Sequence, residues 1–428
     1  MLARFELDRH GTDVRRELQA GTVTFMAMAY IVVVNPAILG QAGMDPGAVF
    51  VATCLAAALG TALMGWLANY PLALAPGMSQ NAYFTFGIVL GEGHGWQTAL
   101  GAVFLSGLLF VALSVLPVRE WLFGAIPRSL KLGIAAGVGL FLGFIALRSV
   151  GLVVDDPATL VAAGDLTTPE AVLTLAGLVL IVAFAARGVP GSVLLAMLVL
   201  TILGWLLGVA EFRGVVDLPP DPRPVLGQLD LVGALQWSMV TVVLTLLLVD
   251  VFDTAGTLVA VEARSGLLRP DGSLPRLRGA LLADSTATAA GALLGTSSTT
   301  SFIESGAGVA AGGRTGLTAL TTAGLFLACL FFAPLAQSVP PFATAAALLY
   351  VACIMARALG ELDWDAATEA VPAVVTALAI PLVFSIADGI GIGFLTYAAL
   401  QLATGRARRC TGAVWVVAAV FALKFALL

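Results

Sequence analysis

Long apolar runs separated by short polar stretches make up almost the whole chain. A helix needs about 20 residues of this kind to cross a bilayer. Fourteen apolar segments, most of about this length, can be read, at 19–40, 47–68, 72–91, 97–117, 129–149, 169–187, 190–210, 231–262, 277–295, 298–312, 315–337, 342–357, 369–386 and 388–404. One further apolar stretch, Val414 to Leu428, is either a fifteenth span or a helix in the membrane interface. The pattern predicts an all-α polytopic membrane protein.

Composition and charge placement agree with this prediction. Of the 428 residues only 11% are charged, against roughly 25% in soluble domains. Lys and Arg gather before the first segment and in alternate loops, ending with Arg406, Arg408 and Arg409; Arg213 and Arg223 are the exceptions. Positive charge marks the cytoplasmic side, so we expect a cytoplasmic N-terminus and an inner (plasma) membrane location. The charged N-terminus has no signal-peptide pattern, which makes the first span the insertion signal.

The third and tenth segments are interrupted in the same way. Residues 71–84, PLALAPGMSQNAYF, and residues 295–306, GTSSTTSFIESG, each run from breaker residues through an extended stretch into a short helix. Irregular backbone at membrane depth is tolerated only against protein or beside a water-filled cavity. Two extended runs entering from opposite faces can satisfy their backbone groups by pairing. A solvated loop at the tenth segment and simple kinks are the alternatives.

The interrupted segments are seven positions apart in the series. The sixth and seventh segments, joined at AARGVPGS, likewise match the thirteenth and fourteenth, joined at FSIADGIG. Seven is odd, so the two halves must cross the membrane in opposite directions as inverted repeats. Interrupted helices at corresponding positions of inverted repeats indicate a transport site near the bilayer midplane.

Four carboxylates lie in or near the predicted spans: Asp250, Asp253, Asp284 and Glu304. An ionisable side chain inside a span costs about 2.5–3.5 kcal/mol, so each is a functional hypothesis. Small residues follow Asp253, starting with Thr254, and leave room for a ligand; we therefore expect Asp253 to face the ligand and Asp250 to support it. Glu304 is expected in the first turn of the tenth segment's short helix, beside free backbone N–H groups.

Other chemistry is scarce. Neither histidine, His10 or His94, lies in a span, so a proton-coupled carrier would have to titrate a carboxyl, and Glu304 and Asp253 are the candidates. The spans contain no metal-ligand spacing, no nucleophile with a base and no phosphate loop. The four cysteines have neither disulfide nor metal spacing. We therefore expect a transporter without cofactor or metal, not an enzyme.

Polar and aromatic neighbours complete the predicted site. Asn81 begins the third segment's short helix, and its amide can both donate and accept hydrogen bonds, which suits a polar heterocycle. Phe25, Tyr30, Tyr83 and Phe84 could form a stacking wall, although aromatic residues in spans more often serve packing.

Four stretches resemble a known family. TFMAMAYIVVVNPAIL (24–39), APGMSQNAYF (75–84), LVDVFDTAGTL (248–258) and GTSSTTSFIESGAGVAAGGRTGL (295–317) are similar to the AzgA-like branch of the nucleobase–cation symporters, the adenine/guanine/hypoxanthine permeases. The resemblance implies a fold like that of the bacterial uracil permease, with fourteen spans in two inverted repeats. It further implies a core domain from residues 1–117 and 229–338 and a gate domain from 118–228 and 339–428. The C-terminal stretch departs from that plan.

The resemblance also implies a set of binding residues. The base-holding acids of the eighth and tenth spans match Asp253 and Glu304, and the polar third-span residue matches Asn81. Together with their neighbours, the implied substrate-binding residues are Asp253, Glu304, Asn81, Phe302, Ile303, Thr254 and Phe25. The xanthine/urate branch carries a Gln-His pair in its first span, where this chain reads TFMAMAY.

The function implied is import of a neutral purine nucleobase with protons, by movement of the core against the gate. Sodium as the coupling ion, a homodimer, and the choice between adenine and guanine/hypoxanthine stay open. A pyrimidine or xanthine permease is one alternative. An anion carrier or channel on the same architecture is another, against which the acidic site argues. The expected partners are the lipid bilayer, the base and the coupling ion, and no nucleic acid.

Overall fold

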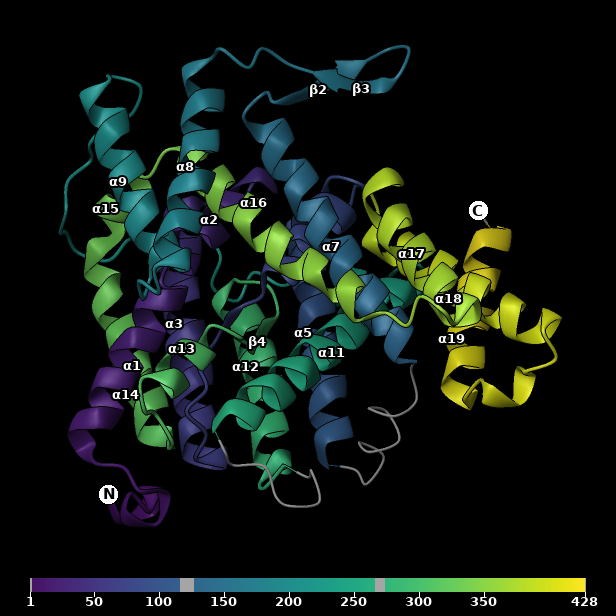
Figure 1. The fold of residues 1–428 in the computed structure, drawn as a ribbon, viewed down its shortest axis with the longest axis horizontal. Coiled ribbons are helices and arrows are strands. Elements are labelled where there is room, and N and C mark those ends of the chain that lie inside the picture. Colours follow the sequence, from purple (N-terminus) through teal and green to yellow (C-terminus); the bar gives the residue numbers. More distant parts are fainter. Residues whose placement is uncertain (1, 116–126, 266–273, 428) are drawn as a thin grey trace.

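The computed structural model describes residues 2–115, 127–265 and 274–427, and they are mostly helical (Figure 1). Within them, nine helices are long and apolar enough to cross a membrane, and three shorter apolar helices accompany them. The fourteen expected segments are all present as helices or as interrupted elements. The protein is an all-α polytopic membrane protein built from two inverted repeats of seven segments, as predicted.

The first repeat contains seven units in chain order. They are α1 (Val14–Met28) with α2 (Ile31–Gln41), α3 (Pro46–Leu63) with η3 (Met64–Ala68), β1 (Leu74–Pro76) with α4 (Met78–Ala82) and η4 (Tyr83–Val89), α5 (Trp96–Val115), α7 (Arg128–Ser149), α8 (Pro169–Ala186) and α9 (Ser192–Leu206). Two features were not predicted: the first segment breaks at Ala29 and Tyr30, and η3 and η4 are π-helical. Pro36, inside α2, has no N–H, and its ring crowds the carbonyl one turn back.

The second repeat follows the same order. It comprises α10 (Leu231–Ala234), η5 (Trp237–Met239) and α11 (Val240–Ser265), then α12 (Leu277–Leu294), β4 (Thr299–Ser301) with α13 (Ser305–Ala310), α14 (Gly316–Cys329) with η6 (Leu330–Phe332) and α15 (Ala333–Gln337), α16 (Pro341–Ala356) with η7 (Arg357–Glu361), α17 (Ala367–Leu382) and α18 (Ile386–Ala403). Short 3-10 helices η1 (Leu2–Phe5), η2 (Asp8–His10) and η8 (Ala407–Arg409) lie outside the repeats.

The C-terminal apolar stretch is a helix, α19 (Gly412–Leu427). It packs against α18 and α11, beside α18 in Figure 1. Lys424 of α19 lies 2.8 Å from Asp388 at the start of α18 and 3.7 Å from Glu92, in the loop after η4. The helix is thus tied to both repeats by charge as well as by apolar contact.

A small hairpin between α7 and α8 was not predicted. Strands β2 (Val153–Asp156) and β3 (Leu160–Ala163) pair antiparallel and project from one end of the molecule (Figure 1). Asp156 accepts hydrogen bonds from the Ala158 and Thr159 N–H groups and from the Thr159 hydroxyl. These bonds close the turn, as Asp side chains commonly do. Asp156 therefore holds this hairpin in shape.

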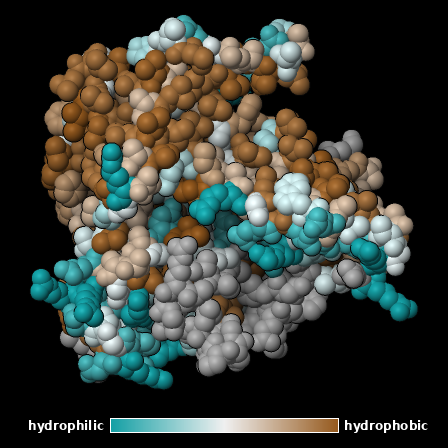
Figure 2. Space-filling model, in the orientation of Figure 1, coloured by the Kyte–Doolittle hydropathy of each residue, from teal (hydrophilic) through white to brown (hydrophobic). Residues whose placement is uncertain are grey.

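The helices pack in two groups. In one, α12 contacts α5 and α3, and α14 contacts α1 and α3. In the other, α16 and α17 pack along α7, and α8 packs on α16 and α9. Apolar side chains cover the outer face of α8 and α9 (Figure 2), where Val179 is 69% and Leu206 78% exposed. Such a face suits contact with lipid tails.

Candidate functional site

The two interrupted segments meet at the centre of the molecule. Strand β1 pairs antiparallel with β4, with Leu74 opposite Ser301, Ala75 opposite Thr300 and Pro76 opposite Thr299. Gly77 N donates to Ser298 O at 2.9 Å, and Phe302 N donates to Ala73 O at 3.0 Å. This pairing was predicted from the need to satisfy backbone groups in lipid, and it is confirmed.

The extended stretch before β4 is buried. Residues Thr296 to Ser301 are at most 5% exposed, so the alternative of a solvated loop is wrong. Gly295 ends α12 with φ +97°, a conformation that side-chain-bearing residues rarely adopt. Asn35 then donates to Thr296 Oγ1 at 2.8 Å. The chain is thereby released from the helix and held by a polar side chain of the first segment.

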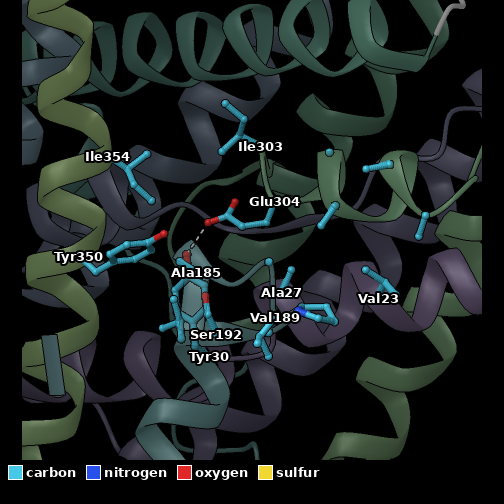
Figure 3. Close-up of a pocket in the computed structure, with 18 of the residues that line it drawn as sticks. Val23, Ala27, Tyr30, Ala185, Val189, Ser192, Ile303, Glu304, Tyr350 and Ile354 are labelled. Carbon is cyan, nitrogen blue, oxygen red and sulfur yellow. Dashed lines mark hydrogen bonds between the residues drawn. The ribbon is translucent and has the colours of Figure 1, made fainter. Parts of the chain in front are cut away.

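Glu304 stands immediately before α13, as its N-cap residue, and not inside its first turn as expected. The Tyr30 hydroxyl donates to Glu304 Oε1 at 2.7 Å. Because Tyr30 occupies the break between α1 and α2, its ring lies beside the start of α13, and Figure 3 shows the two side chains facing each other. The break in the first segment therefore positions the hydroxyl that orients the acid.

A cavity of about 550 Å³ opens beside Glu304. Its wall comes from α1, from the region of α13, from the link between α8 and α9, and from α16. The described lining residues are Val23, Ala27, Tyr30, Ala185, Gly188, Val189, Pro190, Gly191, Ser192, Val193, Ile303, Glu304, Gly306, Ala307, Ala310, Ala311, Tyr350, Val351 and Ile354. Among them Glu304 is the single carboxylate, and none is basic. The volume lies within the range of small-molecule sites, about 300–1,000 Å³.

Tyr350 faces Glu304 across this cavity (Figure 3). It belongs to α16, which packs with α7 and α8, whereas Glu304 belongs to the group of α1, α3, α5, α12 and α14. The cavity therefore lies between the two packed groups. The polar side chains on its wall are one carboxylate, two phenol groups and the Ser192 hydroxyl, and the other side chains are apolar.

Asp253 holds the start of α4, the short helix of the third segment. Its Oδ2 accepts from Ser79 Oγ at 2.7 Å and from Gln80 Nε2 at 3.1 Å, both in α4. Asp253 is not among the described residues that line the cavity. In this conformation the two expected acids therefore have separate partners: Glu304 faces the cavity, and Asp253 faces α4.

Asp250 and Asp284 lie behind strand β4. Asp284 accepts from Thr254 Oγ1 at 2.5 Å and from Ser301 Oγ at 3.3 Å. Asp250 Oδ2 is 2.9 Å from Thr288 Oγ1. Both acids are at most 1% exposed, so α11 and α12 present a buried acidic network to the back of the strand pair.

The remaining predicted residues are spread around the strands. Asn81 is buried and accepts from Ser297 Oγ, which ties α4 to the stretch before β4. Thr254 is buried against Asp284. Phe302 is 5% exposed, and its N–H donates to the Ala73 carbonyl oxygen. Of the predicted binding residues, the structure brings Glu304 and Ile303 together at the cavity, with Tyr30 from the proposed aromatic wall.

The other aromatic candidates serve packing. Phe25 meets Phe326 edge to face, with ring centroids 5.3 Å apart. Tyr83 and Phe84 are at most 1% exposed, and neither is among the described lining residues. Phe25, Tyr83 and Phe84 therefore match the alternative that aromatic residues in spans serve packing.

Sequence reasoning missed Ser79, Gln80 and Tyr350. Ser79 and Gln80 directly precede Asn81, so the whole polar run SQN could have been selected instead of one residue. Tyr350 is the one tyrosine in the apolar twelfth segment, and its polar hydroxyl was the available signal. Their partners come from distant segments and could not be read from spacing.

Solved structures share this fold. The transmembrane domain of a cyanobacterium bicarbonate transporter, BicA, superposes with a TM-score of 0.66 at 17% identity, covering 87% of this chain and 96% of that chain. The structure of SLC26A9 gives 0.63 at 11% identity, covering 91% of this chain and 66% of that chain. The chain therefore shares the inverted-repeat fold of these transmembrane domains.

The family follows from sequence comparison. Residues 15–392 match the model of the Permease family, Xan_ur_permease, and the chain belongs to it. Adenine permease AdeP of Escherichia coli is 44% identical over 98% of this chain and 94% of its own length. Guanine/hypoxanthine permease PbuO of Bacillus subtilis is 42% identical over 99% of this chain and 100% of its own length. The predicted resemblance to purine permeases is confirmed.

Proposed function

We propose that this protein imports purine nucleobases, adenine or guanine and hypoxanthine, across the plasma membrane. The observation that carries the proposal is the Glu304 carboxylate in the cavity between the two packed groups of helices. A purine presents ring N–H groups that can donate to a carboxylate, and flat faces that suit the apolar and phenolic walls. Relatives named as adenine and guanine/hypoxanthine permeases support the substrate class.

Glu304 is assigned the direct contact with the base. Tyr30 holds its carboxylate at 2.7 Å and so presents it in one orientation, which lowers the cost of ordering the site. Asp253 is assigned the placement of α4 through Ser79 and Gln80. In this assignment Glu304 lines the purine site, and Asp253 shapes it by holding α4.

The two packed groups are assigned the roles of core and gate. Residues 1–117 and 229–338 form the core, and residues 118–228 and 339–428 form the gate. Because the cavity lies between the groups, movement of one against the other would open it to one side of the membrane at a time, as in other inverted-repeat carriers. The distribution of Lys and Arg among the loops supports a cytoplasmic N-terminus.

Import is proposed to be driven by protons. The base is neutral, so a proton binding to a buried carboxylate would offset the charge of the site as it closes. Glu304, which precedes the short helix of the tenth segment, and Asp253, which contacts that of the third, are the candidates.

Uptake of labelled adenine, guanine and hypoxanthine at two external pH values tests the function. Glu304→Gln should abolish accumulation in cells that contain the inserted protein, and Asp253→Asn should lower it at least tenfold. Glu170→Gln, on an exposed residue in the first turn of α8, is the matched control and should leave uptake unchanged. Undiminished uptake by the Glu304→Gln variant would remove Glu304 from the mechanism.

A further inference from the structure

Helices α11 and α12 carry three carboxyl groups close to the strand pair, with Asp250 and Asp284 behind β4 and Asp253 against α4. Asp250 is 1% exposed and Asp284 is fully buried, and Asp253 follows Asp250 on the same helix. Among the described residues, the charged groups that interact with Asp250 are Asp284 from α12 and Asp253 from α11. Within the described residues, no Lys, Arg or His forms a salt bridge with any of the three acids. Asp250 and Asp284 are two buried like charges that repel each other, and the half-buried Asp253 adds to the repulsion. With no salt-bridge partner among the described residues, at least one of the acids must carry a proton.

The hydrogen bonds show which acid does. Thr288 Oγ1 lies 2.9 Å from Asp250 Oδ2 and 2.8 Å from the carbonyl oxygen of Thr299. A hydroxyl has one hydrogen, so it can donate to one of these oxygens and not to both. If Asp250 is protonated, its O–H donates to Thr288, and Thr288 donates to Thr299; both contacts then have a hydrogen.

The Thr299 carbonyl depends on this hydroxyl. Backbone bonds link Gly77 to Ser298 and Phe302 to Ala73, so Thr299, opposite Pro76, lies at a non-hydrogen-bonded position of the ladder. Its carbonyl therefore points away from β1, toward α12. An ionised Asp250 would draw the Thr288 hydrogen to itself and leave this carbonyl without its donor.

The other two acids differ from Asp250. Asp284 receives a hydrogen bond on each oxygen, from Thr254 and from Ser301, which suits a carboxylate. Ser79 also faces two acceptors, Asp253 Oδ2 and Gln80 Oε1, each at 2.7 Å, but Asp253 is only half-buried, and water can supply a hydrogen there. Asp250 Oδ1 is buried and has no hydrogen-bond partner among the described residues. An unpartnered oxygen costs far less on a neutral acid than on a carboxylate.

We infer that Asp250 is a binding site for the coupling proton, separate from the purine cavity. The proton stays on Asp250, and its effect is passed to the strand pair by two hydrogen bonds. Asp250 donates to Thr288, and Thr288 donates to the Thr299 carbonyl. Strand β4 leads within three residues to Glu304. Binding and release of one proton at Asp250 thus adds or removes a hydrogen bond that fixes the strand beside the purine site.

This inference rests on the proposed function, because a coupling proton requires a transported substrate. The test uses the full-length protein in liposomes that contain a pH-sensitive dye, with an inward gradient of adenine, guanine or hypoxanthine. Wild type should acidify the interior as the base enters. Asp250→Asn places an amide donor opposite Thr288 and so imitates the protonated acid permanently. It should exchange labelled base at no less than half the wild-type rate, with acidification reduced at least tenfold.

Thr288→Val supplies a second, nearly isosteric variant in case Asp250→Asn does not insert. It removes the hydroxyl between Asp250 and β4, and the number of protons moved per base should fall at least threefold. Ser285→Ala is the matched control, because Ser285 is buried on the same helix and, among the described residues, its hydroxyl bonds to carbonyl groups of that helix alone. It should leave the proton-to-base ratio unchanged.

The outcomes separate the two proposals. A wild-type protein that moves none of the three bases would refute the proposed function. A wild type that moves a base without protons, or an Asp250→Asn variant with the wild-type proton-to-base ratio, would overturn the assignment of Asp250 alone. Where only Thr288→Val can be measured, a wild-type ratio in that variant overturns it equally.

Discussion

Replacing Gly308 by alanine should disturb Glu304 without touching it. Gly308 lies in α13, where the helix crosses α1. A Cβ built there would overlap the Thr24 hydroxyl and stand 2.6 Å from the Ala20 carbonyl oxygen, well inside the roughly 3.5–4.0 Å separation of atoms in contact. Thr24 can rotate away, but the carbonyl belongs to the backbone of α1. The two helices must therefore move apart.

The Gly308→Ala substitution should lower both the stability of the protein and its affinity for purine. Overpacking of a buried contact costs about 1–3 kcal/mol of stability. Separation of α13 from α1 also lengthens the 2.7 Å bond between Tyr30 and Glu304; a hydrogen bond to a charged group is worth about 1.5–3 kcal/mol. If purine binding depends on that bond, its complete loss weakens the affinity by about 10- to 150-fold.

Purified protein in detergent would show both effects, as a lower Tm and as weaker binding of adenine or guanine by titration. Gly324→Ala in α14 is the matched control, since nothing lies within 4 Å of a Cβ built there. It should match wild type or be slightly more stable. A lower Tm with unchanged affinity would refute the step from helix separation to Glu304, and no change in either would refute the steric argument itself.

Two further predictions concern single hydrogen-bond donors and acceptors. Tyr30→Phe removes the hydroxyl that orients Glu304 while keeping the ring, so purine affinity should fall about tenfold in a binding titration with little change in Tm; Phe25→Leu, at a residue outside the described cavity lining, should leave the affinity unchanged. The Thr159 N–H and hydroxyl, and then the Ala158 N–H, donate to Asp156 and lower its pKa. The ionised carboxylate therefore stabilises the β2–β3 turn at pH values above the ordinary pKa of Asp. This stabilisation is lost as the pH falls through the lowered pKa of Asp156. Hydrogen exchange of residues 153–163, corrected for the intrinsic pH dependence of exchange, should therefore show less protection in acid, and Asp156→Ala should show the low protection at neutral pH as well; equal protection in both proteins would contradict the assignment.

Much of the fold could be predicted because lipid leaves few choices. Backbone groups in a membrane must be satisfied within the protein, so apolar length identifies the spans, and the breaks at Pro76 and Gly295 mark the places where helices cannot continue. The pairing of these two breaks followed from the odd spacing of the repeats. The β2–β3 hairpin was missed because it lies in water, where its turn depends on a few side-chain bonds of Asp156.

The site could be predicted only in part. Glu304 and Tyr30 were selected because an acid and aromatic residues stand out in apolar segments, but their mutual bond depends on a break between α1 and α2 that the sequence pattern does not show. Asp253 was expected beside Glu304; in this conformation its partners are Ser79 and Gln80. Which face of a helix meets which neighbour is decided by packing among segments that are hundreds of residues apart.

The pairing of β1 with β4 also bears on how the chain is made. The two strands are roughly 225 residues apart, and at about 5–20 residues per second the ribosome needs about 10–45 s to synthesise that length. During this interval Thr61 of α3 can already serve the N–H and carbonyl of Leu74. The Ala73 carbonyl and the Gly77 N–H, however, lack their partners in the tenth segment, and lipid offers none. The first repeat must therefore wait in a place where water, the insertion machinery or a chaperone can serve as a temporary partner, and it can enter its final position only after the tenth segment has been synthesised.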